Sequence, residues 1–418
     1  MAFLAWGVSP DGPEGTSPAS GNAPLTGEVA SYPRPRLTIP RYVYHTVKAT
    51  LCCSKANVLL VLTPLSVIAA ARGWNPAAVF ALSFFAMFPL AELLSWSTEQ
   101  LSASIGQVIG GLLMAAFGNA VEIIVGVTAL RQEEFRIVQS SMVGSILSGT
   151  LLILGSCLFV AGCKDKEVKF NMDLTSIMSS LMIITSASLV LPSAGYFADL
   201  QLNSAESLSG KGTENSYILT LSRITAILLL VFYSVYVFFQ LRTHADIFAD
   251  SSQAESEEAP ELDPWAAGFV LILSTIGVSV RSDNLLDSVD GSVEELGVSR
   301  AFIGLIIVPI VGNAGEFVAV VNQAGKGNIN FALGLIVGST LQIALFVIPF
   351  LVTSGWIIGR PMSLRFDFFQ TVVLAMSAVV VHCLVREGRS NYFEGFLLLG
   401  TYAIIAIAFY IHPDVADY

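Results

Sequence analysis

The chain has 418 residues, of which 54% are hydrophobic and 13% are charged, and its formal net charge is −11. Soluble domains carry about 25% charged residues, so this composition excludes an ordinary soluble protein. The acidic balance also argues against binding to nucleic acid, which calls for a basic surface. Because the apolar residues come in runs of about 20, the length of a helix that crosses a lipid bilayer, we expect an all-α polytopic membrane protein.

The apolar runs divide the chain into a tail, a first span and two larger units. The tail contains seven prolines and little apolar periodicity, which predicts disorder. In order, we expect a disordered tail (1–40), a first transmembrane helix with its flank (41–75), a first unit of five helices (76–241), an acidic loop (242–263), a second unit of five helices (264–411) and a short C-terminal tail (412–418). The eleven expected spans, arranged 1 + 5 + 5, lie near 56–72, 76–97, 104–130, 137–162, 171–191, 217–241, 264–281, 298–324, 328–354, 366–385 and 392–411.

A short motif occurs once in each unit. Residues Gly118–Glu122 read Gly-Asn-Ala-Val-Glu, and residues Gly312–Glu316 read Gly-Asn-Ala-Gly-Glu. The same offset of 194 residues relates three further positions in each unit, which pair Gly144 with Gly338, Ser145 with Ser339, and Ser148 with Gln342. Two related units of five spans each must insert with opposite orientations. We therefore expect two five-helix inverted repeats, which typically place a substrate site near the bilayer midplane.

Basic residues predict the orientation of the chain. Five Lys and Arg residues precede the first span, and Lys164, Lys166 and Lys169 follow the fourth. Both groups fall on the same side of the membrane, which the positive-inside rule assigns to the cytosol. The N-terminal tail and the acidic loop are then expected in the cytosol, and the C-terminus on the opposite side.

Each motif places a carboxylate inside an apolar span. A charge at the centre of a membrane helix costs roughly 2.5 kcal/mol or more, so Glu122 and Glu316 call for an explanation. Gly and Asn have poor helix propensity, which predicts a break in each helix. Asn119 and Asn313 are expected to cap the half-helices that follow, with Glu122 and Glu316 at the third helical position, as in a capping box. One alternative is that these caps only fix a kink.

The other alternative is a cation site. Two carboxylates, the side-chain carbonyls of Asn119 and Asn313, and backbone carbonyls freed at the breaks are hard oxygen ligands, which suit Ca²⁺, Mn²⁺ or Mg²⁺. Two facing carboxylates in a low dielectric must hold a divalent cation or take up protons. This exclusivity would couple the flux of a cation to a counter-flux of protons. The supporting polar groups are expected to be Glu99, Asp283, Ser145, Ser148, Ser339 and Gln342.

Glu92, within the second span, is a further candidate for a buried acid. The sequence contains no nucleophile–base pair, phosphate-binding loop or cofactor fingerprint. We therefore expect a secondary transporter in a lipid bilayer rather than an enzyme, with no cofactor and no nucleic-acid partner.

These motifs resemble the cation/proton exchanger (CAX) family of the Ca²⁺:cation antiporter superfamily. The likeness runs from about Asn57 to Pro413. Its strongest stretches are 118–122, 143–148, 302–306, 309–314, 342–347 and 390–395. The resemblance implies eleven spans and export of cytosolic Ca²⁺ in exchange for H⁺, in a vacuolar or other acidic-organelle membrane. It also implies that Glu122 and Glu316 are the central acids, with Asn119 and Asn313 beside them.

Several residues depart from the pattern of that family. Phe317 follows Glu316 where His is usual, and Gly149 stands in place of a common Asn. Met114 and Ala116 occupy a stretch that usually contains Asn and Thr, and Asp283 replaces a usual Glu. These changes leave two alternatives open beside Ca²⁺/H⁺ exchange. One is an antiporter of the same fold for Mn²⁺ or Na⁺, and the other is a transport-inactive membrane regulator.

Overall fold

The computed structural model describes residues 39–105, 107–203, 211–244 and 260–411. The predicted disordered tail up to residue 38, most of the acidic loop and the C-terminal tail lie outside these residues. The last two residues of the expected tail, Ile39 and Pro40, begin the first helix.

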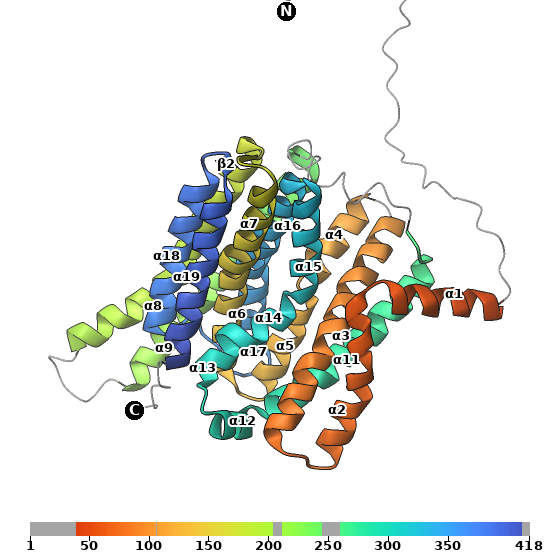
Figure 1. Ribbon diagram of the computed structural model, residues 1–418. Helices are drawn as coiled ribbons and strands as arrows, with labels where there is room; N and C mark the ends of the chain where they lie inside the picture. Colours follow the sequence, from red (N-terminus) through yellow and green to blue (C-terminus); the bar gives the residue numbers. More distant parts are fainter. Residues whose placement is uncertain (1–38, 106, 204–210, 245–259, 412–418) are drawn as a thin grey trace, which may run out of the picture. The chain divides into compact units, whose positions relative to one another are not determined.

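The described chain is almost entirely helical (Figure 1). The elements of the first half are α1 (Ile39–Cys52), the 3₁₀ segment η1 (Lys55–Val61), α2 (Leu62–Ala71), α3 (Pro76–Ser104), α4 (Gln107–Phe117), α5 (Ala120–Arg131), α6 (Phe135–Leu147), the π-helical segment η2 (Ser148–Ile153), α7 (Leu154–Lys164), β1 (Val168–Lys169), α8 (Met172–Asn203), α9 (Lys211–Phe238) and the π-helical segment η3 (Phe239–Thr243). Those of the second half are α11 (Pro264–Asp287), α12 (Val289–Leu296), α13 (Arg300–Phe302), the π-helical segment η4 (Ile303–Ile307), α14 (Val308–Gly312), α15 (Ala314–Lys326), α16 (Ile329–Gln342), the π-helical segment η5 (Ile343–Val347), α17 (Ile348–Ile357), α18 (Phe368–Val385), β2 (Arg389–Ser390) and α19 (Tyr392–Ile411).

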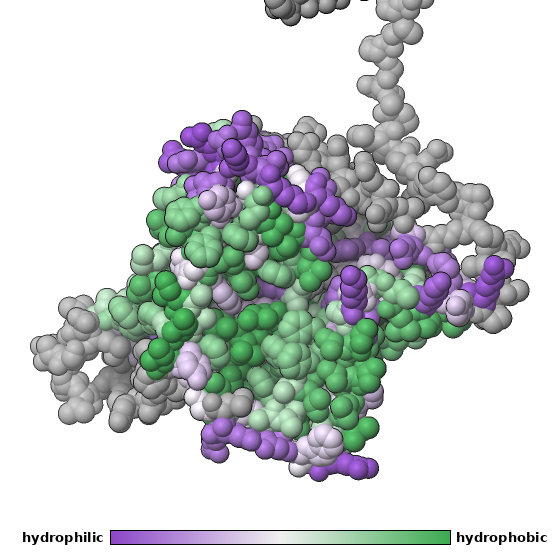
Figure 2. Space-filling view, viewed as in Figure 1, coloured by the Kyte–Doolittle hydropathy of each residue, from purple (hydrophilic) through white to green (hydrophobic). Residues whose placement is uncertain are grey.

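The lengths and hydropathies of these helices confirm the prediction of a polytopic helical membrane protein. Within the described residues, eight helices are long and apolar enough to cross a bilayer, and the number rises to eleven if each of three bent pairs forms one span. Figure 2 shows a band of apolar side chains between two hydrophilic ends of the molecule. Such a band is the surface that lipid tails would cover.

The helix breaks predicted at the two motifs are confirmed. In the first motif, α4 and α5 are separated at Gly118 and Asn119, with a bend of 43° between them. In the second, Asn313 separates α14 from α15. The third residue of α5 is Glu122 and the third of α15 is Glu316, as expected.

The first span differs in form from the expected single helix. It consists of η1 followed by α2, and together they make an angle of 103° with α1. The cause is local, because the Ser54 hydroxyl accepts a hydrogen bond from the N–H of Ala56 at 3.0 Å and so caps a new helical segment. The expected flank of this span is thus a separate helix, α1.

The first helices of the two repeats, α3 and α11, pack together and run in opposite directions (Figure 1). At one end, Asn75 before α3 donates a hydrogen bond to Glu295, which follows α11. At the other end, Gln100 near the end of α3 accepts hydrogen bonds from the N–H groups of Glu261 and Leu262, which precede α11. An inverted repeat requires this antiparallel arrangement.

Two glycines bring the central helices of the two repeats into contact. A Cβ atom on Gly144 of α6 would overlap the backbone of Leu305 and the ring of Pro309. A Cβ on Gly304 would lie 2.9 Å from the Cβ of Ser140. The absence of these side chains lets α6 pack closely against η4 and α14, which carry the second motif.

Candidate cation site

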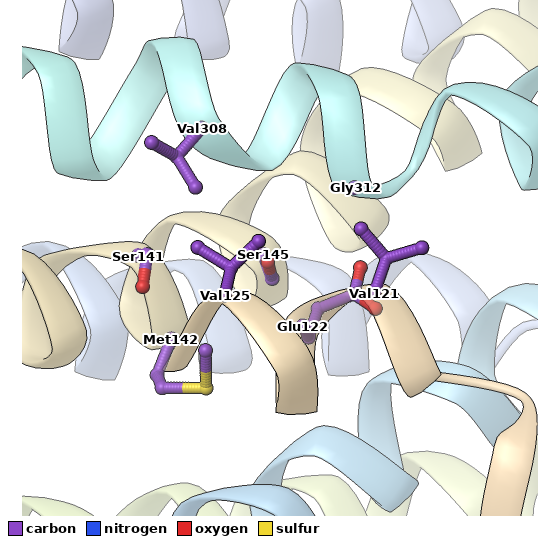
Figure 3. A pocket seen from close by; sticks show the side chains of 8 residues that line it. All are labelled: Val121, Glu122, Val125, Ser141, Met142, Ser145, Val308 and Gly312. Atoms are coloured by element: carbon purple, nitrogen blue, oxygen red, sulfur yellow. The ribbon is translucent and has the colours of Figure 1, made fainter. Parts of the chain in front are cut away.

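The carboxylate of Glu122 lies against the helix break of the other repeat. Glu122 stands in the first turn of α5 and is 7% exposed. A Cβ atom on Gly312, the first residue of the second motif, would lie only 2.7 Å from Glu122 Oε1 (Figure 3). The glycine of one motif therefore provides the space for the acid of the other.

A narrow cavity adjoins Glu122, with room for about one water molecule or ion. It lies between α5, α6 and the η4–α14 segment, as Figure 3 shows. Its lining residues are Val121, Glu122, Val125, Ser141, Met142, Ser145, Val308 and Gly312. Ser145 was expected at the site. Ser141 and Met142 were not, because only the packing of α6 against α14 shows which of its faces meets the acid.

The second acid, Glu316, is held by a serine hydroxyl. Glu316 is half-buried in the first turn of α15, and the Ser339 Oγ of α16 lies 3.0 Å from its Oε2. The same hydroxyl lies 3.0 Å from Asn119 Oδ1 of the first repeat. A hydroxyl has one proton, so it can donate to only one of these oxygens at a time. The structure thus brings Ser339, Asn119 and Glu316 together, and Glu122 is near enough to interact with Glu316 electrostatically.

The prediction that Asn119 and Asn313 cap their own helices is wrong. Both stand at the N-cap position, but neither side chain bonds to the following half-helix. Instead, Asn313 Nδ2 donates to Ser148 Oγ at 3.1 Å and to the Ser145 carbonyl at 3.4 Å. Asn119 Nδ2 reaches the equivalent carbonyl, that of Ser339, at 3.5 Å. Both amides bond to the facing helix of the other repeat instead, so they link the two repeats.

One of the carbonyls expected to be free at the breaks is already occupied. The Ala115 carbonyl near the end of α4 accepts hydrogen bonds from Gln342 Nε2 and from the hydroxyl of Tyr233, the latter at 2.6 Å. In the second repeat, the equivalent carbonyl of Pro309 accepts from the backbone N–H of Asn313 at 2.9 Å. Tyr233 was not among the predicted site residues, because the apolar run of α9 contains both Tyr233 and Tyr236 and the sequence does not distinguish them.

Glu99 and Asp283 are half-buried on α3 and α11, the packed pair of first helices. Their part in the site remains a prediction. Glu92 has a clearer place, because a Cβ on Gly315 would lie 3.4 Å from the Glu92 Cα. Helix α3 therefore borders the first turn of α15, next to Glu316.

Two of the residues that depart from the family pattern lie close to these groups. A Cβ on Gly149 would lie 2.8 Å from Thr340 Oγ1, so an Asn here would require Thr340 to move. Phe317 is half-buried and packs against the apolar core. Within the described residues, no cluster of three or more His, Cys, Asp or Glu side chains could hold a metal ion. A bound cation would therefore depend on two carboxylates together with amide, hydroxyl and backbone oxygens.

Comparisons with known proteins agree with this architecture. The family model described as "Sodium/calcium exchanger protein" matches residues 75–242 and 266–411. The chain is 38% identical over 393 residues to the vacuolar calcium ion transporter of Schizosaccharomyces pombe, covering 94% of this chain and 93% of that protein. It is 37% identical over 374 residues to the Ca²⁺/H⁺ antiporter of Synechocystis, covering 86% and 97%.

The fold is also similar to that of solved structures. Native YfkE superposes with a TM-score of 0.71 at 32% identity, covering 85% of this chain and all of that one. The H⁺/Ca²⁺ exchanger CAX gives a TM-score of 0.59 at 12% identity, which speaks to the fold alone. With two broken helices, two inward-facing acids and matches over most of its length, the chain belongs to the sodium/calcium exchanger protein family.

Proposed function

We propose that this protein exchanges Ca²⁺ for H⁺, moving Ca²⁺ from the cytosol into an acidic compartment across the vacuolar membrane. Relatives named as a vacuolar calcium ion transporter and a Ca²⁺/H⁺ antiporter support this assignment. The observation that carries it is the position of Glu122, buried against Gly312 at the break of the other repeat. The carboxylates of the two repeats then belong to one site.

The charge of this site explains the coupling of the two fluxes. Among the described Lys and Arg side chains, none forms an ion pair with Glu122 or Glu316. Two carboxylates without a cationic partner, in surroundings of low dielectric, cannot both stay ionised and empty. Either a divalent cation neutralises both, or protons do. Because the two occupants exclude each other, cation release on one side is linked to proton uptake there.

Oxygen atoms around the acids suit Ca²⁺. We assign Glu122 and Glu316 as the ligands that carry charge, and the side-chain carbonyls of Asn119 and Asn313 as neutral ligands. Ser145, Ser148 and Ser339 supply hydroxyl groups that bond to these amides and acids or line the cavity. Gln342 has a different part, because its amide is engaged with the Ala115 carbonyl.

The test is Ca²⁺ uptake into sealed vesicles that are acidic inside. Neutralisation of either acid, by Glu122→Gln or Glu316→Gln, should reduce proton-driven Ca²⁺ uptake by about 100-fold or more, because the divalent ion loses half of its balancing charge. Glu133→Gln is the matched control, since Glu133 is an exposed acid paired with Arg360. Full uptake by both Gln variants would overturn the proposal. A transport-inactive regulator would instead be favoured if the wild type showed no uptake and if neutralising both acids left the cell phenotype unchanged.

Exchange of Mn²⁺ is a second candidate. The observation that favours it is Met142, whose side chain lines the cavity beside Glu122. Carboxylate and carbonyl oxygens suit Mn²⁺ as well as Ca²⁺, and the thioether of Met142 adds a softer group to a site where Ca²⁺ would take oxygen ligands alone. Uptake measured with Ca²⁺, Mn²⁺ and Na⁺ in competition decides among these ions, and a clear Ca²⁺ preference would eliminate the other two.

A further inference from the structure

We propose that Tyr233 is a positioning residue of the cation site. Its hydroxyl, together with Gln342, holds the Ala115 carbonyl near the end of α4 and so fixes the position of Asn119 and Glu122 beyond the break. The effect on Ca²⁺ affinity rests on the function proposed above, whereas the effect on the helix break does not.

The Ala115 carbonyl lies four residues before Asn119, at the break of the first repeat. In a continuous helix, the carbonyl of residue 115 would accept from the N–H of residue 119, where the chain breaks. Here the Tyr233 hydroxyl donates to this carbonyl at 2.6 Å, and Gln342 Nε2 donates to it as well. A carbonyl oxygen has two lone pairs, so both are in use. The Ala115 carbonyl is thus neither available to a bound cation nor free to close the helix.

The equivalent carbonyl of the other repeat has a different partner. The Pro309 carbonyl, at the position equivalent to Ala115, accepts from Asn313 N–H within the same chain segment. The break in the second repeat is therefore held by its own backbone. In the first repeat, the last such backbone bond is one residue earlier, from Gly118 N–H to the Met114 carbonyl at 2.8 Å, and the Ala115 carbonyl is held by side chains from α9 and α16.

The phenol ring of Tyr233 is itself held in place by an aromatic contact. The Tyr233 ring stacks on Phe346 of η5, with 4.9 Å between centroids and 22° between planes. Phe346 follows Gln342 by four residues, so both donors to Ala115 are positioned by the same segment. Neighbouring side chains of α9 point outward, and Phe232 and Val235 are largely exposed. Tyr233 accordingly lies on the inward face of α9, together with buried residues such as Leu229 and Tyr236, while the opposite face of the helix is exposed.

Loss of this hydrogen bond should weaken the site without removing a ligand. With one donor gone, the Ala115 carbonyl can compete for the N–H of Asn119, and the start of α5 then shifts. A hydrogen bond of ordinary strength corresponds to about a fivefold change in affinity. Tyr233→Phe should therefore raise the KM for Ca²⁺ by about fivefold while the maximal rate changes little.

The same helix offers a matched control. Tyr236, three residues further on, is buried, and its hydroxyl has no hydrogen-bond partner among the described residues. Tyr236→Phe removes an identical hydroxyl without removing a bond, so its KM should equal that of the wild type. Gln342→Leu should raise KM in the same sense as Tyr233→Phe. Tyr233 and Gln342 donate to the same carbonyl. The effects of Tyr233→Phe and Gln342→Leu on KM should therefore not be additive when the two changes are combined.

The test combines vesicle uptake with hydrogen–deuterium exchange of the purified full-length protein. We expect faster exchange in peptides covering residues 112–122 for Tyr233→Phe, and wild-type exchange for Tyr236→Phe. Equal exchange and equal KM in the two variants would overturn the inference. A fall in maximal rate with unchanged KM would also overturn it, because that outcome indicates a structural role only. If the wild type fails to exchange Ca²⁺, the proposed function is wrong, and the exchange of the 112–122 peptides still decides whether Tyr233 holds the break.

Discussion

The two motifs have almost the same sequence but unlike surroundings. The first, at Gly118–Glu122, is held by side chains of α9 and α16, and its acid faces a narrow cavity. The second, at Gly312–Glu316, keeps a backbone hydrogen bond across its break, and its acid accepts from Ser339. The half-site of Glu122 is thus held by side chains from two distant helices, α9 of its own repeat and α16 of the other. We expect the segment around Glu122 to change its conformation during transport, and the segment around Glu316 to stay more rigid.

The largest effect should come from filling the space that the second motif gives to Glu122. A Cβ on Gly312 would meet Glu122 Oε1 at 2.7 Å, whereas a Cβ on Gly315 would meet its nearest atom at an ordinary 3.4 Å. Overpacking costs about 1–3 kcal/mol, so Gly312→Ala should lower Ca²⁺ uptake by roughly tenfold to 100-fold.

Gly315→Ala is the control for this change, because the first motif already carries Val121 at the equivalent position. It should retain most of the uptake. Equal losses in the two variants would mean that the close contact with Glu122 does not matter, and the comparison between the motifs would lose its basis.

A smaller effect should come from Ser339, which touches both halves of the site. Ser339→Ala removes the hydrogen bond to Glu316 and the contact with Asn119. A hydrogen bond to a charged group contributes more than a neutral one, so we expect about a tenfold rise in the KM for Ca²⁺.

The control is Thr340→Val, at the next position of α16. The Thr340 hydroxyl bonds only to the Ile336 carbonyl of its own helix among the hydrogen bonds described. Its loss should leave KM close to that of the wild type. A similar KM in the two variants would show that Ser339 contributes no more than any buried hydroxyl of this helix.

The smallest effect concerns the ion pairs that tether the start of the second motif's helix. Arg300 contacts Glu134 at 3.3 Å and Asp290 at 2.6 Å, and thereby joins α13 to the start of α6. These side chains are partly exposed, so Arg300→Gln should lower the free energy of unfolding by only about 1 kcal/mol.

Arg360→Gln is the matched comparison, because Arg360 pairs with Glu133 alone among the contacts described. It should cost about 0.5 kcal/mol or less, measured as thermal unfolding in detergent. A larger cost for Arg360→Gln would contradict the expectation that a guanidinium with two carboxylate partners stabilises the fold more than one with a single partner.

Much of the fold could be predicted from the sequence, because it follows from local properties. Apolar runs determine the spans, and the poor helix propensity of Gly and Asn determines the breaks. The offset of 194 residues also relates Ser145 to Ser339, and the structure shows the carbonyls of these two serines within reach of the two amides. These features depend on residues close together in the chain or on its internal repetition.

What the sequence did not reveal depends on packing between the repeats. Asn119 and Asn313 look like caps when each motif is taken alone, and only the facing helix shows why they bond elsewhere. Met142 and Tyr233 have no motif of their own, since their roles arise from the contact of α6 with α14 and of α9 with η5. The bend of the chain at Ser54 likewise depends on one serine capping a segment that could equally have continued.

The single proton of the Ser339 hydroxyl gives the two half-sites a means of communication. An ionised Glu316 attracts this proton more strongly than the neutral amide oxygen of Asn119 does. Once Glu316 is neutralised by a proton, that advantage is lost, and the hydroxyl can turn to Asn119 by rotation of one side-chain bond. The occupancy of one acid is thereby signalled to the neighbourhood of the other, with no rearrangement of the backbone.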